Sequence, residues 1–361
     1  MKKVLLGLFI FWVSACSSHS EVSPTALFEV PSHFPDPVYP IAQNPVTEAG
    51  FTLGKQLFYD GILSRDSTIA CGECHRQYYS FTHHLHDLSH GIEGRIGLRN
   101  SLTLQNLAWE KVFMWDGATD SLDKQPLIPI QHPDEMDDTI ENVLRKLKAS
   151  STYPALFKAA YGTDEITSDR LTHALVQFML TLISANSKYD NYLNGKTTLT
   201  ADESAGMALF ESKGCSNCHA GVLFTDGSFR NNGLSKYERT KIVYVNEVPT
   251  LQVVIDYGRY FITNVETDRY KFKVPTLRNI AMSLPYMHDG RFTTLQEVLD
   301  YYASGVQDTQ NLDPLLKNGS TLGIPMTSDE KTKIIAFLNT LTDTDFLSDK
   351  RFAEPDGFPV R

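Results

Sequence analysis

The pentapeptide Cys-x-x-Cys-His occurs twice in this chain, at residues 71–75 and again at residues 215–219. Two thiols at this spacing can add to the two vinyl groups of one haem, and the histidine that follows can ligate the iron. The pattern is typical of covalent c-type haem attachment, so we expect two covalent haems that can exchange electrons. The residues expected to bind them are Cys71, Cys74, His75, Cys215, Cys218 and His219.

A structural zinc site is the alternative interpretation of these four cysteines. Zinc ribbons do combine two such pairs, but usually within a few tens of residues. Here 144 positions separate Cys71 from Cys215, and a histidine directly follows each pair. The spacing therefore favours two haems over one zinc ion.

The fifth cysteine, Cys16, belongs to a segment of another kind. Lys2 and Lys3 precede a nearly continuous apolar run, residues 4–13, and small residues stand directly before the cysteine. This is the layout of a signal peptide, and it resembles the lipobox of bacterial lipoproteins. The run is short for a transmembrane span. Residues 1–16 are therefore predicted to be a lipoprotein signal peptide, with an ordinary signal peptide as the alternative. In either case we expect export, to the periplasmic face of a bacterial membrane.

Residues 17–45 have the composition of a spacer between that anchor and the rest of the chain. Six prolines interrupt them, and serines stand near their start. Such segments are extended and semi-rigid. We therefore expect a Pro/Ser-rich tether that holds a lipid-anchored body away from the membrane surface.

An internal repeat divides the rest of the chain into two units. The sequence Gly-x-x-Leu-Phe precedes the first haem motif at residues 54–58 and the second at residues 206–210. The length that remains after the tether suits two domains of ordinary size. We predict an N-terminal haem c domain over residues 46–195 and a C-terminal haem c domain over residues 196–361.

Helical periodicity dominates the chain, and the expected fold class is mostly α, with two cytochrome c-like haem domains. Apolar residues recur at helical spacing, and capping boxes begin helices at Thr200 and Thr327. Strand signals are few, the best being residues 241–245. The other helices expected from these patterns cover residues 139–148, 170–193, 294–303 and 327–341. The longest is expected to cross the join between the domains.

The formal net charge of the chain is −10. An acidic balance argues against binding to nucleic acid. It suits an encounter with a basic redox partner, such as a small cytochrome c.

Further motifs stand between the two haem attachment sites. Arg99-Asn100 is followed by an aromatic stretch that ends in Trp115-Asp116-Gly117. Gln125 and Glu135 come ten and twenty positions after the tryptophan. Any one of these signals is weak alone, but their common register is specific.

Two more motifs follow the second attachment site. Residues 273–279 read Lys-Val-Pro-Thr-Leu-Arg-Asn, and residues 285–290 read Pro-Tyr-Met-His-Asp-Gly. Over roughly residues 48–345 the chain resembles the bacterial dihaem cytochrome c peroxidase and MauG family. The resemblance implies a peroxidatic haem in the N-terminal domain and an electron-transfer haem in the C-terminal domain.

The resemblance also implies roles for three residues between the attachment sites. Peroxide cleavage needs a group that takes a proton from one peroxide oxygen and returns it to the other. Glu135 is expected to be this group, with Gln125 as its hydrogen-bonding partner, and the indole of Trp115 is expected to couple the haems. Taken alone, Glu135 is an acid in an acidic loop and Trp115 is a core residue; their register favours the functional roles.

Sixth ligands would determine which haem reacts. The resemblance suggests His90 for the first haem; the alternative is a surface histidine, in which case this haem is open at rest. For the second haem, the spacing from the motif at 285–290 indicates Tyr302, and the MauG branch has a tyrosine ligand at this position. The alternative is that Tyr302 is a residue of the hydrophobic core. Met282 and Met287 are further candidates. A phenolate ligand favours ferric iron and gives a lower potential than methionine does.

The family also binds a calcium ion between its domains. The matching positions are Asn100, through its side chain, and Ser283 and Pro285, through their main-chain carbonyl groups. Oxygen ligands suit calcium. Arg278, within the motif at 273–279, is expected to contact a haem.

Three functions follow from these interpretations. The first is a dihaem cytochrome c peroxidase that reduces hydrogen peroxide to water with electrons from a small cytochrome c or a cupredoxin. The second is a MauG-like oxidase that uses a peroxide-derived ferryl haem to oxidise a protein or an organic substrate. The third is a dihaem electron carrier without catalysis, against which Glu135 and Gln125 argue, whereas Tyr302 favours the second function over the first. A homodimer is a further expectation.

Overall fold

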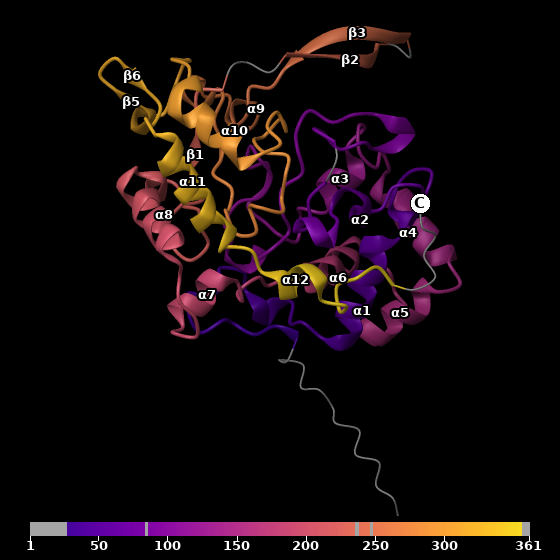
Figure 1. Ribbon diagram of the computed structural model, residues 1–361. Coiled ribbons are helices and arrows are strands. Elements are labelled where there is room, and N and C mark those ends of the chain that lie inside the picture. The colour runs from indigo at the N-terminus through magenta and orange to yellow at the C-terminus, as the bar shows by residue number, and fades with distance from the viewer. Residues whose placement is uncertain (1–26, 84–85, 235–237, 246–247, 356–361) are drawn as a thin grey trace, which may run out of the picture.

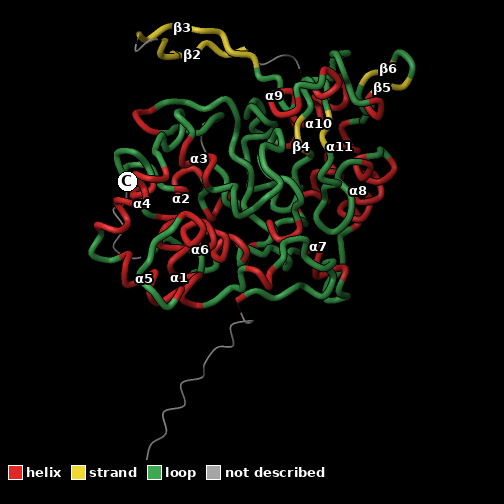
Figure 2. Tube along the Cα trace, turned by 180° about the vertical axis from the view of Figure 1, so that it is seen from behind, coloured by secondary structure: helices red, strands yellow, loops and turns green. Residues whose placement is uncertain are grey.

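The structure, a computed structural model, describes residues 27–83, 86–234, 238–245 and 248–355. The predicted signal peptide with Cys16 and the first part of the predicted tether lie outside these ranges. Helices gather at two sides of the body, and long loops fill the region between them (Figures 1 and 2). Among the residues in these ranges, no helix has the length and apolar character needed to cross a bilayer.

Among the described residues, helices outnumber strands in both halves of the chain. The N-terminal half contains α1 (Glu48–Tyr59), α2 (Cys71–Cys74), α3 (Leu127–Gln131), α4 (Ile140–Ala149), α5 (Tyr153–Tyr161) and α6 (Ser168–Leu180). The C-terminal half contains α7 (Lys188–Leu193), α8 (Ala201–Ser212), α9 (Tyr260–Thr263), α10 (Leu295–Asp300), α11 (Ser328–Asn339) and α12 (Thr344–Ser348). The antiparallel strand pairs are β1 (Phe229–Arg230) with β4 (Phe272–Lys273), β2 (Glu238–Val245) with β3 (Val248–Ile255), and β5 (Lys317–Asn318) with β6 (Thr321–Leu322). The mostly α fold class is confirmed.

Predicted helices are found where a capping signal marks their start. The side chain of Thr139 caps α4, and capping boxes at Thr200 and Thr327 begin α8 and α11. The helix predicted over residues 294–303 is observed as α10 followed by a π-helical turn, Tyr301–Gly305. Local sequence therefore determines these helix starts.

The single long helix predicted over residues 170–193 is wrong. Helix α6 ends at Leu180, and α7 begins only at Lys188. Ser187 starts α7 with a capping box, because its side chain accepts from the N–H of Asp190 and the Asp190 carboxylate accepts from the N–H of Ser187. Serine and asparagine side chains offer the main chain partners outside a helix. Apolar residues also stand between the two helices, so the sequence pattern predicted one continuous helix.

Each half contains the same close helix crossing. Gly54 of α1 lies against the main chain of Ala174 in α6, and Gly206 of α8 lies against the main chain of Lys333 in α11. A Cβ at either glycine would overlap a carbonyl oxygen, so only glycine allows this approach. The repeated Gly-x-x-Leu-Phe sequence thus marks two equivalent helix pairs, which lie on opposite sides of the body (Figure 1).

Aromatic rings complete these crossings in the same way. Phe58 and Phe178 pack with ring centroids 5.0 Å apart in the first half, and Phe210 and Phe337 pack at 5.4 Å in the second. Buried apolar residues form a separate core around each pair. The described residues thus form two separate hydrophobic cores.

Part of the predicted tether packs on the body, so that expectation is wrong for residues 27–45. The ring of Phe34 packs edge-on against Trp109 at 5.1 Å, and the Trp109 indole N–H donates to the Pro35 carbonyl at 2.7 Å. Tyr39 is buried as well. The aromatic residues of this segment outweigh its prolines, because burying each ring removes a large apolar surface from water.

The last described segment of the chain packs in the first core. Phe346, Leu347 and Phe352 are buried among residues of the N-terminal half, and the hydroxyl of Tyr59 donates to the carbonyl of Phe352 at 2.7 Å. In Figure 1, α12 lies at the side of the body that holds α1 and α6. The last described segment of the predicted C-terminal domain, residues 196–361, therefore packs in the first core.

The hairpin of β2 and β3 projects from the body (Figures 1 and 2). Its strands pair antiparallel, from Glu238 with Ile255 at the base to Val245 with Val248 at the tip. The strand predicted at residues 241–245 lies within β2 and is confirmed.

Candidate active site

The first Cys-x-x-Cys-His motif opens onto a cavity of about 420 Å³, which Cys71, Cys74 and His75 line. The Nδ1 atom of His75 donates to the carbonyl oxygen of Phe81 at 2.7 Å. Burial lowers the pKa of His75, so its ring is neutral. The Nε2 atom is then the free ring nitrogen, as a proximal haem ligand requires.

The second motif repeats this arrangement around a separate cavity of about 240 Å³. His219 donates from Nδ1 to the carbonyl oxygen of Phe224 at 3.1 Å, and burial lowers its pKa as well. Phe81 and Phe224 both have left-handed backbone, with φ of 58° and 51°, a conformation that is uncommon for a bulky residue. The same unusual turn therefore orients both histidines.

The four motif cysteines are free thiols. Burial raises the pKa of Cys71 and of Cys74 to about 12, and that of Cys215 to about 11. Each cysteine pair stands beside its own histidine on its own cavity, which is the donor set of a c-type haem. The two pairs do not meet around one point, so the zinc alternative is excluded.

Two predicted catalytic residues lie on the first cavity. Gln125 lines it from just before α3, and Glu135 lines it from the turn after α3. The Nδ1 atom of His132 lies 3.8 Å from the Glu135 carboxylate. Burial raises the pKa of Glu135 above its usual range; His132 opposes this shift and Asp134 adds to it. A carboxyl group with a raised pKa suits proton transfer near neutral pH.

Trp115 lines both cavities. Its indole Nε1 donates to the Asn100 carbonyl at 2.8 Å, and its own carbonyl accepts from the N–H of Lys273 at 2.7 Å. Lys273 also lines both cavities, and its buried ammonium pairs with Glu110. One hydrogen bond therefore holds the indole and another holds the main chain of Trp115, at the place where the two cavities approach each other.

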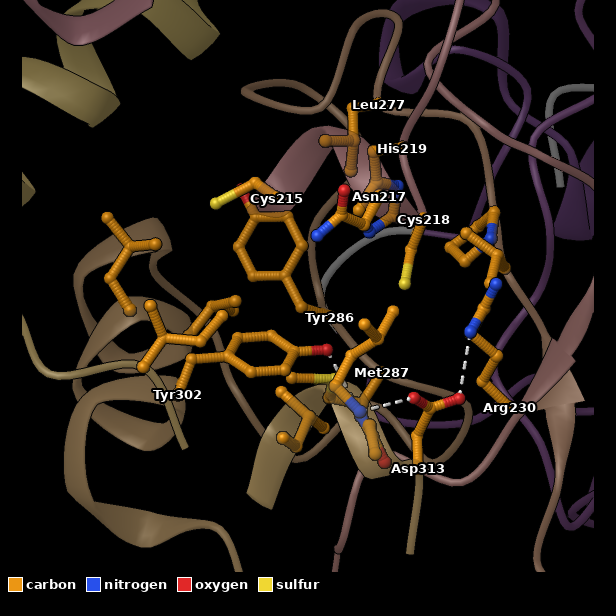
Figure 3. Close-up of a pocket in the computed structure, with 18 of the residues that line it drawn as sticks. Cys215, Asn217, Cys218, His219, Arg230, Leu277, Tyr286, Met287, Tyr302 and Asp313 are labelled. Carbon is orange, nitrogen blue, oxygen red and sulfur yellow. Dashed lines mark hydrogen bonds and ion pairs between the residues drawn. The ribbon is translucent and has the colours of Figure 1, made fainter. Parts of the chain in front are cut away.

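Tyr302 lies in the second cavity, on the π-helical turn after α10. Its hydroxyl and the sulfur of Met287 lie beside one amide, at 3.3 Å and 3.5 Å from Nδ2 of Asn232. Figure 3 shows Tyr302 and Met287 pointing toward one another inside the cavity. Burial raises the pKa of Tyr302, and the hydrogen bond with Asn232 opposes that shift. Two of the candidate ligands thus meet here, whereas Met282 lines neither cavity.

His90 lines the first cavity, and its ring packs against that of His86 with centroids 4.7 Å apart. His83 lies 5.2 Å from His86, and burial lowers its pKa to about 4. His84 lies outside the described residues. The structure therefore brings the predicted ligand His90 to the haem cavity, at the end of a short row of histidine rings.

Arg278 is not among the residues that line either cavity. Its fully buried guanidinium forms two hydrogen bonds with the Asp190 carboxylate, at 2.8 and 2.9 Å. His33, from the segment before α1, contacts the same carboxylate at 2.8 Å. These contacts do not support the expectation that Arg278 binds a haem. A buried guanidinium needs a partner of opposite charge, and Asp190 provides it.

Asn100 lies where the two halves meet. Its side-chain nitrogen donates to the Pro285 carbonyl at 2.6 Å, and its main-chain N–H donates to the His288 carbonyl at 2.7 Å. Its side-chain oxygen is buried and has no hydrogen-bond partner among the described residues. Ser283 is buried as well, two residues before Pro285. The structure thus brings Asn100 and Pro285 together and leaves one amide oxygen unpaired beside them.

Three cavity residues were missed by the sequence interpretation. Asn232 stands in a loop without a motif, and only its contacts with Tyr302 and Met287 identify it. Met114 and His288 had a signal, because Met-x-Asp-Gly occurs both at residues 114–117 and at residues 287–290. That second internal repeat would have identified them.

Comparisons with known proteins show which family these features represent. The family model described as di-haem cytochrome c peroxidase matches residues 48–198. The methylamine utilization protein MauG of Methylorubrum extorquens is 34% identical over 325 residues, which cover 88% of this chain and 83% of that protein. The cytochrome c551 peroxidase of Nitrosomonas europaea is 35% identical over 309 residues, which cover 85% and 84% respectively.

A solved structure has the same fold. The crystal structure of a MauG-like protein associated with microbial copper homeostasis matches with a TM-score of 0.78 and 32% identity, over 91% of this chain and 98% of that one. Two Cys-x-x-Cys-His cavities in a mostly α fold, joined through one tryptophan, define a dihaem redox protein. The chain belongs to the di-haem cytochrome c peroxidase family. It is accordingly an oxidoreductase of the peroxidase type, with two c-type haems.

Proposed function

We propose that this protein reduces hydrogen peroxide to water at the first haem site, with electrons that a small redox protein delivers through the second. The observation that carries the proposal is the presence of Glu135 and Gln125 on the larger of the two cavities. Trp115, which lines both cavities, supports electron transfer between them. A plain electron carrier needs no acid–base group on its haem cavity.

Glu135 performs the proton transfer in this proposal. When bound, the first haem supplies an iron at which peroxide can be reduced. The Glu135 carboxylate takes the proton from one peroxide oxygen and returns it to the other, which then leaves as water. Two electrons from the donor protein and two protons from solvent complete the conversion of one peroxide to two waters.

Gln125 and Trp115 have supporting roles. The amide of Gln125 can donate and accept hydrogen bonds beside Glu135, so it can hold peroxide or water in the orientation that proton transfer needs. The indole N–H of Trp115 donates to the Asn100 carbonyl, and the main-chain carbonyl of Trp115 accepts from the N–H of Lys273. A ring fixed in this way keeps one geometry between the two haems during successive turnovers.

A MauG-like oxidase is the second candidate, and Tyr302 in the second cavity favours it. A phenolate ligand stabilises ferric iron and gives a lower potential than methionine does. The second haem would then accept electrons less readily and would store an oxidising equivalent more readily. A protein or an organic molecule would be oxidised in place of the small redox protein.

The haem domains and the resting ligand of the first haem belong to the same proposal. Each hydrophobic core would form one haem domain, with the peroxidatic haem in residues 46–195 and the electron-transfer haem in residues 196–342. The segment after residue 342 would belong to the first domain, since it packs there. The first haem would be open at rest; ligation by His90, which lines the same cavity, is the alternative.

A calcium ion between the two halves is proposed at Asn100. The unpaired, buried side-chain oxygen of Asn100 beside the Pro285 carbonyl supports this site. Ser283 would add its main-chain carbonyl. Amide and carbonyl oxygens are ligands that calcium accepts, and the ion would join the two halves next to Trp115.

The N-terminal sequence supports export and a lipid anchor. Residues 1–16 carry the pattern of a lipoprotein signal peptide, so we propose anchoring through Cys16 on the periplasmic face of a bacterial membrane. A homodimer is proposed on the family resemblance alone.

Stopped-flow mixing of the holoprotein with hydrogen peroxide tests the catalytic proposal. Glu135→Gln keeps the shape of the side chain but cannot accept the proton, so it should slow the peroxide reaction by about 10²–10⁴-fold. Asp134→Asn is the matched control, because this acid also lines the cavity, and it should react close to the wild-type rate. A Glu135→Gln protein that reacts as fast as wild type would show that another group transfers the proton.

A further inference from the structure

One turn is present twice at the junction of the two halves. Residues 113–117 read Phe-Met-Trp-Asp-Gly, and residues 286–290 read Tyr-Met-His-Asp-Gly. In each copy the first N–H donates to the carbonyl six residues later, at 2.8 Å and at 2.7 Å. In each copy the glycine N–H donates back to the methionine carbonyl, at 3.2 Å and at 3.3 Å. The two turns are therefore equivalent in structure as well as in sequence.

The methionine of each turn has the same unusual backbone. Met114 has φ of 69° and Met287 has φ of 72°, in the left-handed region that residues other than glycine rarely adopt. Met114 lines the first haem cavity, and Met287 lines the second. Each turn thus brings one thioether into one haem cavity.

A side-chain amide contacts the sulfur in each cavity. The Nε2 atom of Gln125 lies 3.7 Å from Sδ of Met114, and the Nδ2 atom of Asn232 lies 3.5 Å from Sδ of Met287. A thioether sulfur is a weak hydrogen-bond acceptor for such a group. Gln125 follows its turn in the chain, whereas Asn232 precedes its own, so the internal repeat does not explain why both sulfurs have an amide partner.

A thioether is also a good axial ligand for a c-type haem. A methionine that moved freely in either cavity would compete for the side of the iron opposite the motif histidine. We propose that Gln125 and Asn232 are paired positioning residues, which hold the sulfurs of Met114 and Met287 and so keep them from the two haem irons. The inference rests on the proposed function, since it assumes an open first site and, at the second site, the Tyr302 ligand of the MauG-like candidate.

The consequence differs between the two cavities. In the first, holding Met114 leaves room for peroxide beside Glu135. In the second, Asn232 also bonds the hydroxyl of Tyr302 at 3.3 Å, so one amide restrains the sulfur and orients the oxygen. Tyr302 and Met287 point toward one another in this cavity (Figure 3). Asn232 thereby selects the tyrosine oxygen over the methionine sulfur.

The first-site experiment is an EPR spectrum of the as-isolated ferric holoprotein. Gln125→Leu removes the amide donor at similar size, and Met114 should then bind, so the high-spin signal should be lost. A near-infrared charge-transfer band of methionine-ligated ferric haem should appear with it. The double variant Gln125→Leu/Met114→Leu should recover the high-spin signal, which damage to packing alone would not allow. An unchanged high-spin signal in Gln125→Leu overturns the inference for this site.

The second-site experiment uses the same spectra and the reduction potential of the second haem. Asn232→Leu should produce the methionine band and raise the potential, and Asn232→Leu/Met287→Leu should lose the band again. Asn318→Leu is the matched control, because Asn318 is an exposed asparagine of β5 that lines neither cavity. It should leave spectrum and potential unchanged. A wild-type spectrum in Asn232→Leu overturns the selection role.

Two further measurements separate this inference from the proposed function. If wild-type protein lacks a high-spin haem even after one-electron reduction, or if Tyr302→Phe leaves the spectrum unchanged, the ligand assignments of the proposed function are wrong and the inference falls with them. If both behave as proposed while the amide variants have no effect, the inference alone is overturned.

Discussion

Trp115 and His288 meet edge to face, with ring centroids 6.4 Å apart, at equivalent positions of the two repeated turns. His288 is also stacked on Phe272, with 3.7 Å between centroids. Burial lowers the pKa of His288 to about 4, so its ring is neutral. The internal repeat of the chain therefore brings together a pair of neutral aromatic rings, at the place where the two cavities approach each other.

Trp115→Phe is expected to slow electron transfer from the second haem to the first more than it slows the peroxide reaction. The variant keeps an aromatic ring but loses the indole bond to Asn100 and part of the ring that reaches both cavities. Stopped-flow absorbance of protein reduced at the second haem alone measures both steps. Trp109→Phe, which changes a tryptophan of the first core, is the control. Equal slowing in the two variants would remove Trp115 from the electron path.

The rate of the peroxide reaction is expected to fall as the pH is lowered. Glu135 accepts a proton only as a carboxylate, so activity is lost when the pH falls through its pKa. Because burial raises that pKa, the loss should begin at a higher pH than for an ordinary glutamate, whose pKa is about 4.3. A pH–rate profile of the wild-type protein should show this fall in rate at low pH, and the profile of Glu135→Gln should lack it. The same fall in rate in Glu135→Gln would show that another group titrates.

Gly206→Ala is expected to destabilise the second core. A Cβ at this position would overlap the Lys333 carbonyl, so α8 and α11 have to move apart. Overpacking of this kind typically costs about 1–3 kcal/mol, which urea unfolding followed by circular dichroism can measure. Gly97→Ala is the control, because its nearest contact would be the Ser89 carbonyl at 3.9 Å. Equal stability of the two variants would show that the crossing tolerates a methyl group.

Removal of calcium by a chelator is expected to lower the melting temperature of wild-type protein. An ion that binds only the folded state stabilises it, and here it would join the two halves at Asn100. Asn100→Ala should already melt lower and should not respond to the chelator or to added calcium. A chelator response in Asn100→Ala that equals that of wild type would place the ion elsewhere.

Membrane attachment is expected to depend on Cys16. In cells that process lipoproteins, wild-type protein should partition with membranes, and Cys16→Ala should release it or block its maturation. Fractionation followed by immunoblotting measures this. Wild-type protein recovered in the soluble fraction, beginning at a residue other than 16, would favour the ordinary signal peptide.

Features that depend on neighbours in the chain were predictable from the sequence. Examples are the Cys-x-x-Cys-His motifs, the capping boxes at Thr200 and Thr327 and the repeated Gly-x-x-Leu-Phe. Each acts within a few residues, so its spacing in the sequence is enough to identify it. The break between α6 and α7 was missed for a related reason. Its signal, the capping box at Ser187, is as local as the others, but the apolar residues on both sides of it continue a helical pattern and predicted one long helix.

The sequence by itself determined that this chain binds two c-type haems in a mostly α fold, because covalent attachment and helix capping are encoded at short range. Only the tertiary structure decided which distant groups meet. It paired Arg278 with Asp190, 88 positions earlier, packed residues 27–45 on the body, and set Asn232 between Tyr302 and Met287. Such contacts depend on the simultaneous packing of many segments, so they cannot be predicted from the spacing of residues in the sequence.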